Sequence, residues 1–323
     1  MKKIIVGFDG FVDVLVKPIK EKGETTEYFD TIGNLGRYLV GQEGKSCSIE
    51  YDIFKRKHGG NAPLLSTAAA HLGMDTTCIG MMGYPSLDPV FAPLNFKKIS
   101  YMPPGEATAL EFNDGKVFLA PGLELKDPWE RVNEAFAYEA EKAFQQADTI
   151  ALVNWSEITF AKELWKNILN CLPDFNEKKE KHILFDLCDT TRKPKNEVDD
   201  ILQLIGRFSK KGTTTLSLNE NECLDVGKKI FDINDSKLIA KNIRSFFSID
   251  EILVRSKRWV YIIAKDTECL KDTNHVEKPV ISTGAGDNYN AAYCYGTAKG
   301  LTHEERIDFC NKFVHGYLSK GGY

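Results

Sequence analysis

The amino-acid sequence predicts an α/β protein whose mostly parallel central sheet is covered by helices on both faces and carries a small β lid. Two observations predict the sheet. Short apolar, β-branched runs alternate with segments of helical periodicity, and the 323 residues suit one large α/β domain. A hairpin signal that interrupts this alternation predicts the lid. We therefore expect a single domain over residues 1–323, with the lid formed by insertions near 12–30 and 100–120.

The strands of the predicted sheet are short and rich in valine, isoleucine and threonine, as buried parallel strands usually are. They lie at 3–7, 75–80, 149–153, 182–186, 214–218 and 259–264. The helices between them are predicted at 62–72, 128–146, 159–171, 196–209, 220–227 and 236–247. A further strand at 276–281 and a helix at 288–299 complete the alternation near the C-terminus.

The lid is predicted from segment 101–119, which lacks helical periodicity. Two short strands, 108–112 and 116–119, are joined there by Asn113-Asp114-Gly115, a typical hairpin turn. The run 12–19 is a candidate third strand. A hairpin inserted into a β–α chain is typical of a flap that closes over a ligand.

The composition excludes several classes of function. The formal net charge is -4 and the pI is about 6.0, so neither nucleic acid nor a membrane surface is expected as a partner. Acidic residues interrupt the N-terminal apolar run, which predicts a core strand and not a signal peptide. The eight cysteines are scattered without a C-x-x-C pair, which is typical of reduced thiols and predicts a cytoplasmic protein.

The segment 41–46 (G-Q-E-G-K-S) superficially resembles a P-loop but lacks the spacing of one. The preceding 32–40 is helical in pattern and the following 48–53 is extended. A P-loop needs the opposite order, strand then helix. We interpret 41–46 as a surface turn.

The stretch that carries chemistry is Gly284-Ala285-Gly286-Asp287, between the predicted strand 276–281 and helix 288–299. Glycines at such a junction let a ligand approach the backbone, and the unpaired N–H groups at a helix start form an anion site. Asp287 beside that site could accept a proton from an attacking hydroxyl. The alternative from these residues alone is a tight turn with Asp287 as a helix cap.

With Thr283 before it and Asn288 to Ala292 after it, this stretch resembles the C-terminal signature of the ribokinase-like (PfkB) carbohydrate kinases. The resemblance implies a ribokinase-like three-layer sandwich and an ATP-dependent phosphotransferase. It implies that Asp287 is the general base and that the N–H groups of Gly284, Ala285 and Gly286 hold the transferred phosphoryl group. Thr283 is then placed on the nucleotide side.

Other features follow in the order that the family has them. Gly59-Gly60-Asn61 before a helix is similar to the family's sugar-binding Gly-Gly motif, and Asp13 to its sugar-binding aspartate. Asn219 and Glu222 resemble the N-x-x-E motif that organises Mg²⁺ and its waters, although the same spacing also makes a helix capping box. Asn311 resembles a residue beside the adenine. Independently of the resemblance, Glu111 on a lid strand could reach a sugar hydroxyl.

The sequence departs from the family pattern at two positions that bear on cofactor and substrate. Ile281 occupies the place of the first signature aspartate, which helps to form a monovalent-cation site in many members, so no potassium requirement is implied. Leu64 stands where a second sugar-facing asparagine often lies.

We expect an ATP- and Mg²⁺-dependent kinase that phosphorylates a hydroxyl of a sugar or sugar derivative. Two alternatives stay open. One is a nucleoside kinase on the same fold, with Phe11 or Trp155 stacking on the base. The other is a catalytically silent homologue that binds sugar or nucleotide. A homodimer through the lid is a further expectation, because exposed apolar strand faces can pair between subunits.

Overall fold

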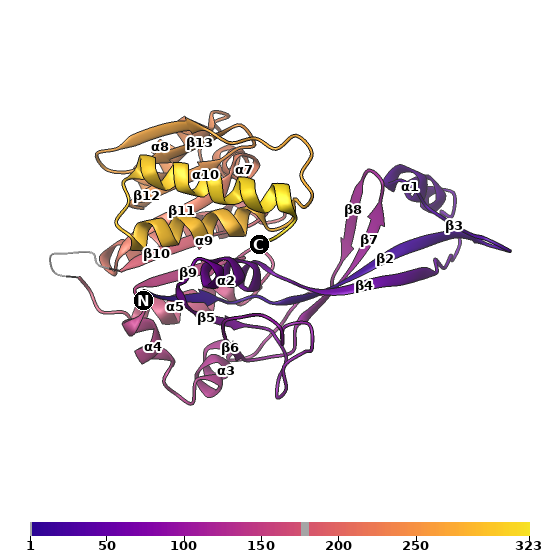
Figure 1. The fold of residues 1–323 in the computed structure, drawn as a ribbon, viewed down its shortest axis with the longest axis horizontal. Coiled ribbons are helices and arrows are strands. Elements are labelled where there is room, and N and C mark those ends of the chain that lie inside the picture. Colours follow the sequence, from indigo (N-terminus) through magenta and orange to yellow (C-terminus); the bar gives the residue numbers. More distant parts are fainter. Residues whose placement is uncertain (1, 176–180) are drawn as a thin grey trace.

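The computed structural model describes residues 2–175 and 181–323, and a nine-stranded sheet runs through its centre (Figure 1). In spatial order the strands are β14 (Glu268–Asp272), β13 (Trp259–Ile263), β12 (Glu251–Arg255), β11 (Thr213–Asn219), β10 (His182–Asp186), β9 (Thr149–Val153), β1 (Lys3–Gly7), β5 (Asp75–Gly80) and β6 (Lys97–Ser100). From β6 to β12 every pairing is parallel, and β13 and β14 add an antiparallel edge. The predicted mostly parallel sheet is therefore confirmed.

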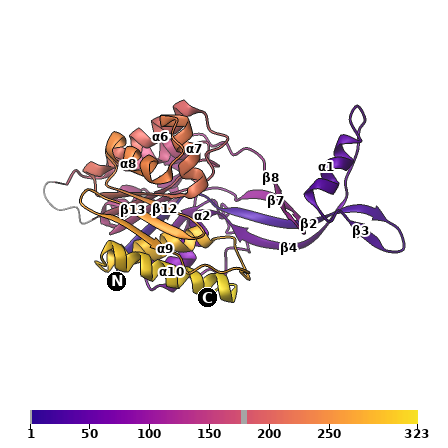
Figure 2. The ribbon, with the colours of Figure 1, turned by 90° about the horizontal axis from the view of Figure 1, so that it is seen from above.

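Helices cover both faces of this sheet, as Figure 2 shows from above. One face carries α2 (Asn61–His71), α9 (Ala285–Ala298) and α10 (His303–Lys320). The other carries α3 (Pro128–Ala135), α4 (Ala140–Gln146), α5 (Ala161–Cys171), α6 (Lys195–Arg207), α7 (Glu220–Phe231) and α8 (Ser236–Phe247), with a short 3-10 turn at Phe208–Lys210. Two separate apolar cores result, one under each layer, and β9 and β10 are buried along their whole length.

A second, smaller sheet projects from this body (Figures 1 and 2). We call it the small sheet: β2 (Phe11–Lys22), β3 (Thr26–Tyr28), β4 (Tyr51–Gly59), β7 (Gly105–Phe112) and β8 (Gly115–Leu119), with α1 (Ile32–Val40) beside it. The hairpin predicted around Asn113-Asp114-Gly115 is present as β7–β8. The turn at 41–46 follows α1 and precedes β4, so it is not a P-loop.

Two predicted elements of the main body differ from the structure, and strands β6, β12 and β14 were not predicted. The helix expected over 128–146 is two helices, because Ala137 and Tyr138 adopt positive φ angles of 51° and 63° between them. The run 276–281 is not a strand; it lies against α10, where the N–H of Val280 donates to the carbonyl of Leu318 at 2.9 Å.

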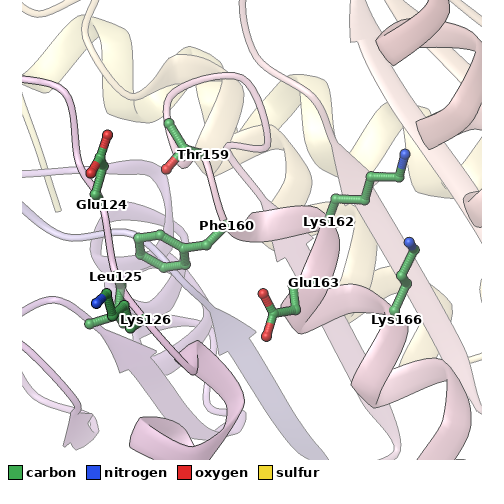
Figure 3. A pocket seen from close by; sticks show the side chains of 8 residues that line it. All are labelled: Glu124, Leu125, Lys126, Thr159, Phe160, Lys162, Glu163 and Lys166. Atoms are coloured by element: carbon green, nitrogen blue, oxygen red, sulfur yellow. The ribbon is translucent and has the colours of Figure 1, made fainter.

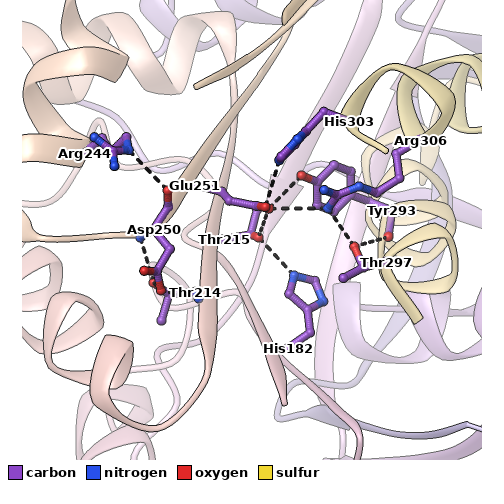
Figure 4. A network of polar contacts seen from close by, with 10 residues as sticks. All are labelled: His182, Thr214, Thr215, Arg244, Asp250, Glu251, Tyr293, Thr297, His303 and Arg306. Atoms are coloured by element: carbon purple, nitrogen blue, oxygen red, sulfur yellow. Dashed lines mark hydrogen bonds and ion pairs between the residues drawn. The ribbon is translucent and has the colours of Figure 1, made fainter. Parts of the chain in front are cut away.

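A buried polar network lies between the strands and the α9–α10 layer (Figure 4). Its centre is the Glu251 carboxylate, which accepts hydrogen bonds from the hydroxyls of Thr215 and Tyr293, both at 2.8 Å. His303 Nε2 lies 2.9 Å from the same carboxylate and Arg306 Nη1 lies at 3.5 Å. Burial raises the pKa of Glu251, but the bond from His303 and the charge of Arg306 outweigh it and hold the pKa well below its usual range.

No helix in the described ranges combines the length and apolar character needed to cross a bilayer.

Candidate active site

Polar side chains follow neighbouring strands at the edge of the sheet where the parallel strands end. Asp9 and Asn154 follow β1 and β9, while Asp186, Asn219 and Arg255 are the last residues of β10, β11 and β12. Open α/β sheets bind their ligands outside the carboxyl ends of the strands. The first turn of α9 reaches the same edge, so this is where we place the site.

The first turn of α9 leaves backbone donors unpaired. Gly284 is the residue before the helix, with φ at +83°, a conformation that glycine adopts without strain. The N–H of Ala285 makes only a long bond of 3.4 Å to Ser282 O. Within the described residues, the N–H groups of Gly286 and Asp287 have no hydrogen-bond acceptor. The turn therefore presents donors and the positive end of the helix dipole to an anion.

Asp287 lies at this turn with only 6% of its surface exposed. Its Oδ1 accepts a hydrogen bond of 2.9 Å from Asn61 Nδ2. Burial, followed by the charges of Asp186 and Asp9, raises the pKa of Asp287 well above its usual range. A carboxylate that is desolvated and held by one directed hydrogen bond is suited to accept a proton.

The Gly59-Gly60-Asn61 turn is anchored by a residue that the sequence did not assign. Asp9 accepts hydrogen bonds from the N–H groups of Asn61 and Ala62 at 2.7 and 2.6 Å, and from Asn154 Nδ2 at 2.7 Å. Gly60 has φ at +94°. Burial raises the pKa of Asp9 to about 6, against these three donors, which lower it. Asp9 thus fixes the start of α2 and the position of Asn61.

Asp13 meets this turn from the small sheet. A Cβ atom on Gly59 would lie 2.6 Å from Asp13 Oδ1, so a larger residue there would displace the Asp13 carboxylate. Lys57 Nζ lies 3.8 Å from Asp13. Burial raises the pKa of Asp13, and the charges of Lys57 and Lys116 oppose the rise. Asp13, Gly59, Gly60 and Asn61 are therefore brought together as the sequence predicted.

Glu111 lies apart from that group. It is on β7, four residues beyond Ala107, which is the register partner of Asp13. Its carboxylate pairs with Lys116 Nζ across the β7–β8 hairpin at 2.6 Å. Even spacing along the strand places Glu111 on the same face of the small sheet as Asp13.

Asn219 and Glu222 form the capping box that their spacing also allowed. Glu222 N–H donates to Asn219 Oδ1 at 2.9 Å, and Asn219 N–H donates to Glu222 Oε2 at 2.8 Å. Oε1 of Glu222 takes no part in this box. Burial, and then the charge of Asp186, raises the pKa of Glu222 to about 7. A carboxylate with a raised pKa and a free oxygen fits a divalent cation, which would favour its ionised form.

Asp186, Arg255 and Asn290 belong to the site, although sequence reasoning missed them. Asp186 Oδ2 accepts from Asn290 Nδ2 at 2.6 Å and lies 3.4 Å from Arg255 Nη2. Asn290 also accepts from Ser217 at 2.7 Å. Asp186 carried a signal, because it is a charged residue closing an apolar strand that was itself predicted. Arg255 carried none, because its strand was missed.

Two residues assigned to the nucleotide side lie near the C-terminal helix. The carbonyl of Thr283 accepts from the Tyr317 hydroxyl at 2.8 Å, and the Thr283 side chain is exposed. Asn311 is 7% exposed, and its Nδ2 donates to Asp272 O at 2.9 Å, which ties α10 to the end of β14.

A hollow of about 790 Å³ lies elsewhere on the surface, beside the start of α5 (Figure 3). Phe160 lies in its middle, with Lys162 and Lys166 on one side and Glu124 and Lys126 on the other. None of its eight lining residues is a predicted site residue. Its mixed charges, with Lys162 already paired to Asp200 at 2.5 Å, give it no catalytic set.

The sequence model of the family described as "Prokaryotic ketohexokinase" matches residues 1–322. The chain belongs to the prokaryotic ketohexokinase family. This is a PfkB-type family, so the resemblance inferred from the Gly284–Asp287 signature is confirmed.

Solved structures place this ketohexokinase-family chain on the ribokinase-like fold. Ribokinase from Thermotoga maritima is 17% identical with a TM-score of 0.68 over 100% of this chain and 94% of its own. Adenosine kinase from Sinorhizobium meliloti is 14% identical with a TM-score of 0.69 over 99% and 95%. Arabidopsis thaliana ribokinase, complexed with ribose and ATP, is 14% identical with a TM-score of 0.64 over 99% and 94%. No curated protein sequence matches the chain.

The family match makes this chain a PfkB-type sugar kinase, and the solved structures show its fold. The acceptor and the role of each residue are proposed below from the geometry of the site.

Proposed function

We propose that this ketohexokinase-family protein transfers the γ-phosphoryl group of ATP to a hydroxyl of a sugar or sugar derivative, with ketohexoses as the first acceptors to test. The observation that carries the proposal is the arrangement around Asp287. A buried carboxylate, held by Asn61 at 2.9 Å, belongs to the same first turn of α9 whose N–H groups are unpaired. A base adjoining an anion site is what phosphoryl transfer to an alcohol requires.

In this mechanism the sugar binds against the surface that Asp13 and the Gly59–Asn61 turn form together. Asp287 accepts the hydroxyl proton as the new oxygen–phosphorus bond forms, and the bond to the leaving ADP oxygen breaks. The backbone N–H groups of Gly284, Ala285 and Gly286 bind the oxygens of the transferred group. Asn61 orients Asp287, so one hydrogen bond links the Gly59–Asn61 turn to the proposed base.

The residues present fit a magnesium–nucleotide complex. Mg²⁺ prefers oxygen ligands and keeps several waters. Asn219 and Glu222 offer oxygen ligands on the same edge of the sheet as the first turn of α9. Asn219 and Glu222 would hold the ion. Glu222 would use Oε1, either directly or through a water molecule. When bound, the ion supplies charge neutralisation between the phosphates. With Ile281 in place of a carboxylate, we propose that potassium is not required.

The test is an ATP-consumption screen over ketoses, aldoses, sugar acids and nucleosides, with and without potassium. We expect turnover with at least one ketose, lost on removal of Mg²⁺ and unchanged by potassium. Absence of turnover with every acceptor, despite measurable ligand binding, would contradict the proposal and favour a silent binding protein.

The nucleoside alternative receives no support from the two aromatic residues suggested for it. Trp155 is 3% exposed, and Lys193 Nζ lies 4.9 Å from its ring centre. The Phe11 ring fills the space beside Gly105, where a Cβ atom would lie 2.5 Å from it. The nucleosides in the screen test this alternative directly.

We further propose that the small sheet closes over the substrate and mediates a homodimer. Its edge strand β8 exposes Phe118 and Leu119, at 55% and 57%, and Val40 at the end of the adjoining α1 is 72% exposed. Exposed apolar side chains on an edge strand are typical of pairing between subunits. Light scattering would give twice the 36.3 kDa chain mass if the proposal holds.

A further inference from the structure

Arg255 stands between the two halves of the site. It ends β12, where its register partner on β11 is Asn219, the first residue of the capping box. On its other side its guanidinium reaches the first turn of α9. Nη1 lies 2.8 Å from the position that a Cβ atom on Gly286 would occupy. The side chain therefore spans from the strand end beside Asn219 to the first turn of α9.

Most of the donors of this guanidinium are unused. Arginine has five N–H donors. Here Nη2 makes one long contact of 3.4 Å with Asp186, whose Oδ2 is already bound more closely by Asn290. Nε is buried and has no hydrogen-bond partner among the described residues. The Arg255 side chain is only 12% exposed, so bulk water does not satisfy most of these donors.

Gly286 makes room for this cation. It is inside α9, with a helical backbone, so no positive φ requires glycine there. A Cβ atom at 286 would lie 2.8 Å from Nη1, so a side chain there would displace the guanidinium from this turn. The guanidinium thus lies against the same turn whose N–H groups are unpaired. The ring of Tyr289, 5.9 Å from the guanidinium carbon, helps to hold it there.

Several carboxylates surround Arg255. Asp9, Asp186, Glu222 and Asp287 all lie at this edge of the sheet, and each is at least partly buried. The positive charge of Arg255 opposes the rise in the pKa of both Glu222 and Asp287. An incoming polyphosphate adds further negative charge next to these carboxylates. A fixed guanidinium with free donors is the group that can accept it.

We propose that Arg255 is a further catalytic residue, which binds the transferred phosphoryl group and neutralises the charge that develops on it. This rests on the proposed phosphotransfer. In that step the acceptor oxygen bonds to the γ-phosphorus, the bond from phosphorus to the β-phosphate oxygen breaks, ADP leaves, and the hydroxyl proton passes to Asp287. Arg255 contributes hydrogen bonds from the β12 side, opposite the backbone N–H groups of α9.

The kinetic test compares Arg255→Gln with the wild-type protein and with Arg207→Gln. Arg207 is an exposed arginine in the last turn of α6, at the opposite end of the sheet. We expect Arg255→Gln to lower kcat about 10²- to 10³-fold, comparable to the loss of one preorganised oxyanion donor. The Kd of the sugar should stay unchanged, and Arg207→Gln should match wild type. In Arg255→Ala, added guanidinium should restore part of kcat.

A binding test separates this inference from the proposed function. We expect Arg255→Gln to weaken binding of β,γ-methylene-ATP by about tenfold while leaving ADP affinity unchanged. That result would support Arg255 as a γ-phosphate ligand even if no acceptor is phosphorylated, in which case only the proposed function fails. Near-wild-type kcat and nucleotide affinities in Arg255→Gln would overturn the inference. So would equal loss of sugar, ADP and analogue binding without guanidinium rescue, because that pattern indicates a structural role.

Discussion

Replacing Glu251 with glutamine tests whether the buried network behind the sheet stabilises the fold through its charge. Glutamine keeps the shape of the side chain but removes the negative charge opposite Arg306. Both side chains are buried, with 9% and 7% of their surfaces exposed. The substitution therefore leaves the Arg306 guanidinium uncompensated inside the protein, while the amide oxygen, in the place of Oε2, can still accept from Thr215 and Tyr293.

The expected cost follows from that environment. Removing one partner of a buried ion pair destabilises proteins by about 3–5 kcal/mol. Because glutamine can still accept both hydroxyl bonds, we expect the lower end, about 3 kcal/mol. At about 2.1 cal/mol/K of unfolding entropy per residue, this loss would lower the Tm of the 323-residue chain by about 4–5 °C.

Differential scanning calorimetry at neutral pH measures this shift, with Glu268→Gln as the control. Glu268 also pairs with a cation, Lys241, but it is half exposed, so its loss should cost no more than about 1 kcal/mol. Equal Tm values for Glu251→Gln and Glu268→Gln would refute the reasoning, because burial would then make no difference to the ion pair.

Three further predictions concern single residues. Asp287→Asn should lower turnover about 10²- to 10⁴-fold with nucleotide binding retained, and near-normal turnover in a coupled assay would rule it out as the base. Asp9→Asn replaces an acceptor of backbone N–H groups with a donor, so it should cost about 1–3 kcal/mol in denaturant unfolding and also reduce turnover; an unchanged unfolding midpoint would contradict this. Burial lowers the pKa of His182 to about 4, so the unfolded chain takes up this proton first as pH falls from about 6.5. Wild-type stability should therefore fall more steeply between pH 6.5 and 4 than that of His182→Gln, and parallel pH profiles would show that His182 is not responsible.

The sequence predicted those parts of the fold whose local pattern agrees with their surroundings. Strands β1, β5, β9 and β10 were predicted with the bounds that the structure has, because each is an apolar run buried between helices. Helix α8 was predicted equally well, from its 3.6-residue periodicity and the Asp235 cap.

Strand β12 escaped prediction because charged residues stand at both of its ends. Glu251 and Arg255 read as surface residues in the sequence. In the structure Glu251 is neutralised by partners from α9 and α10, and Arg255 lies against the first turn of α9. Partners so distant in sequence cannot be identified from one chain, so the strand and its catalytic candidate were missed together.

The glycine motifs were recognisable because their reason is local, but the contacts that connect them are not. Positive φ at Gly60 and Gly284 belongs to the turn itself. The hydrogen bond from Asn61 to Asp287 crosses 226 positions of sequence. The family resemblance suggested that the two motifs meet, and the structure identifies the atoms that do so.

The junction between β4 and α2 connects the small sheet directly to Asn61, the residue that holds Asp287. Strand β4 ends at Gly59, α2 begins at Asn61, and Gly60 alone separates the projecting sheet from the helix that orients the base. A displacement of β4 is transmitted through two peptide bonds to the amide that holds Asp287. Under the proposed closure, an acceptor that draws the small sheet inward would in the same movement shift Asn61 and reorient Asp287.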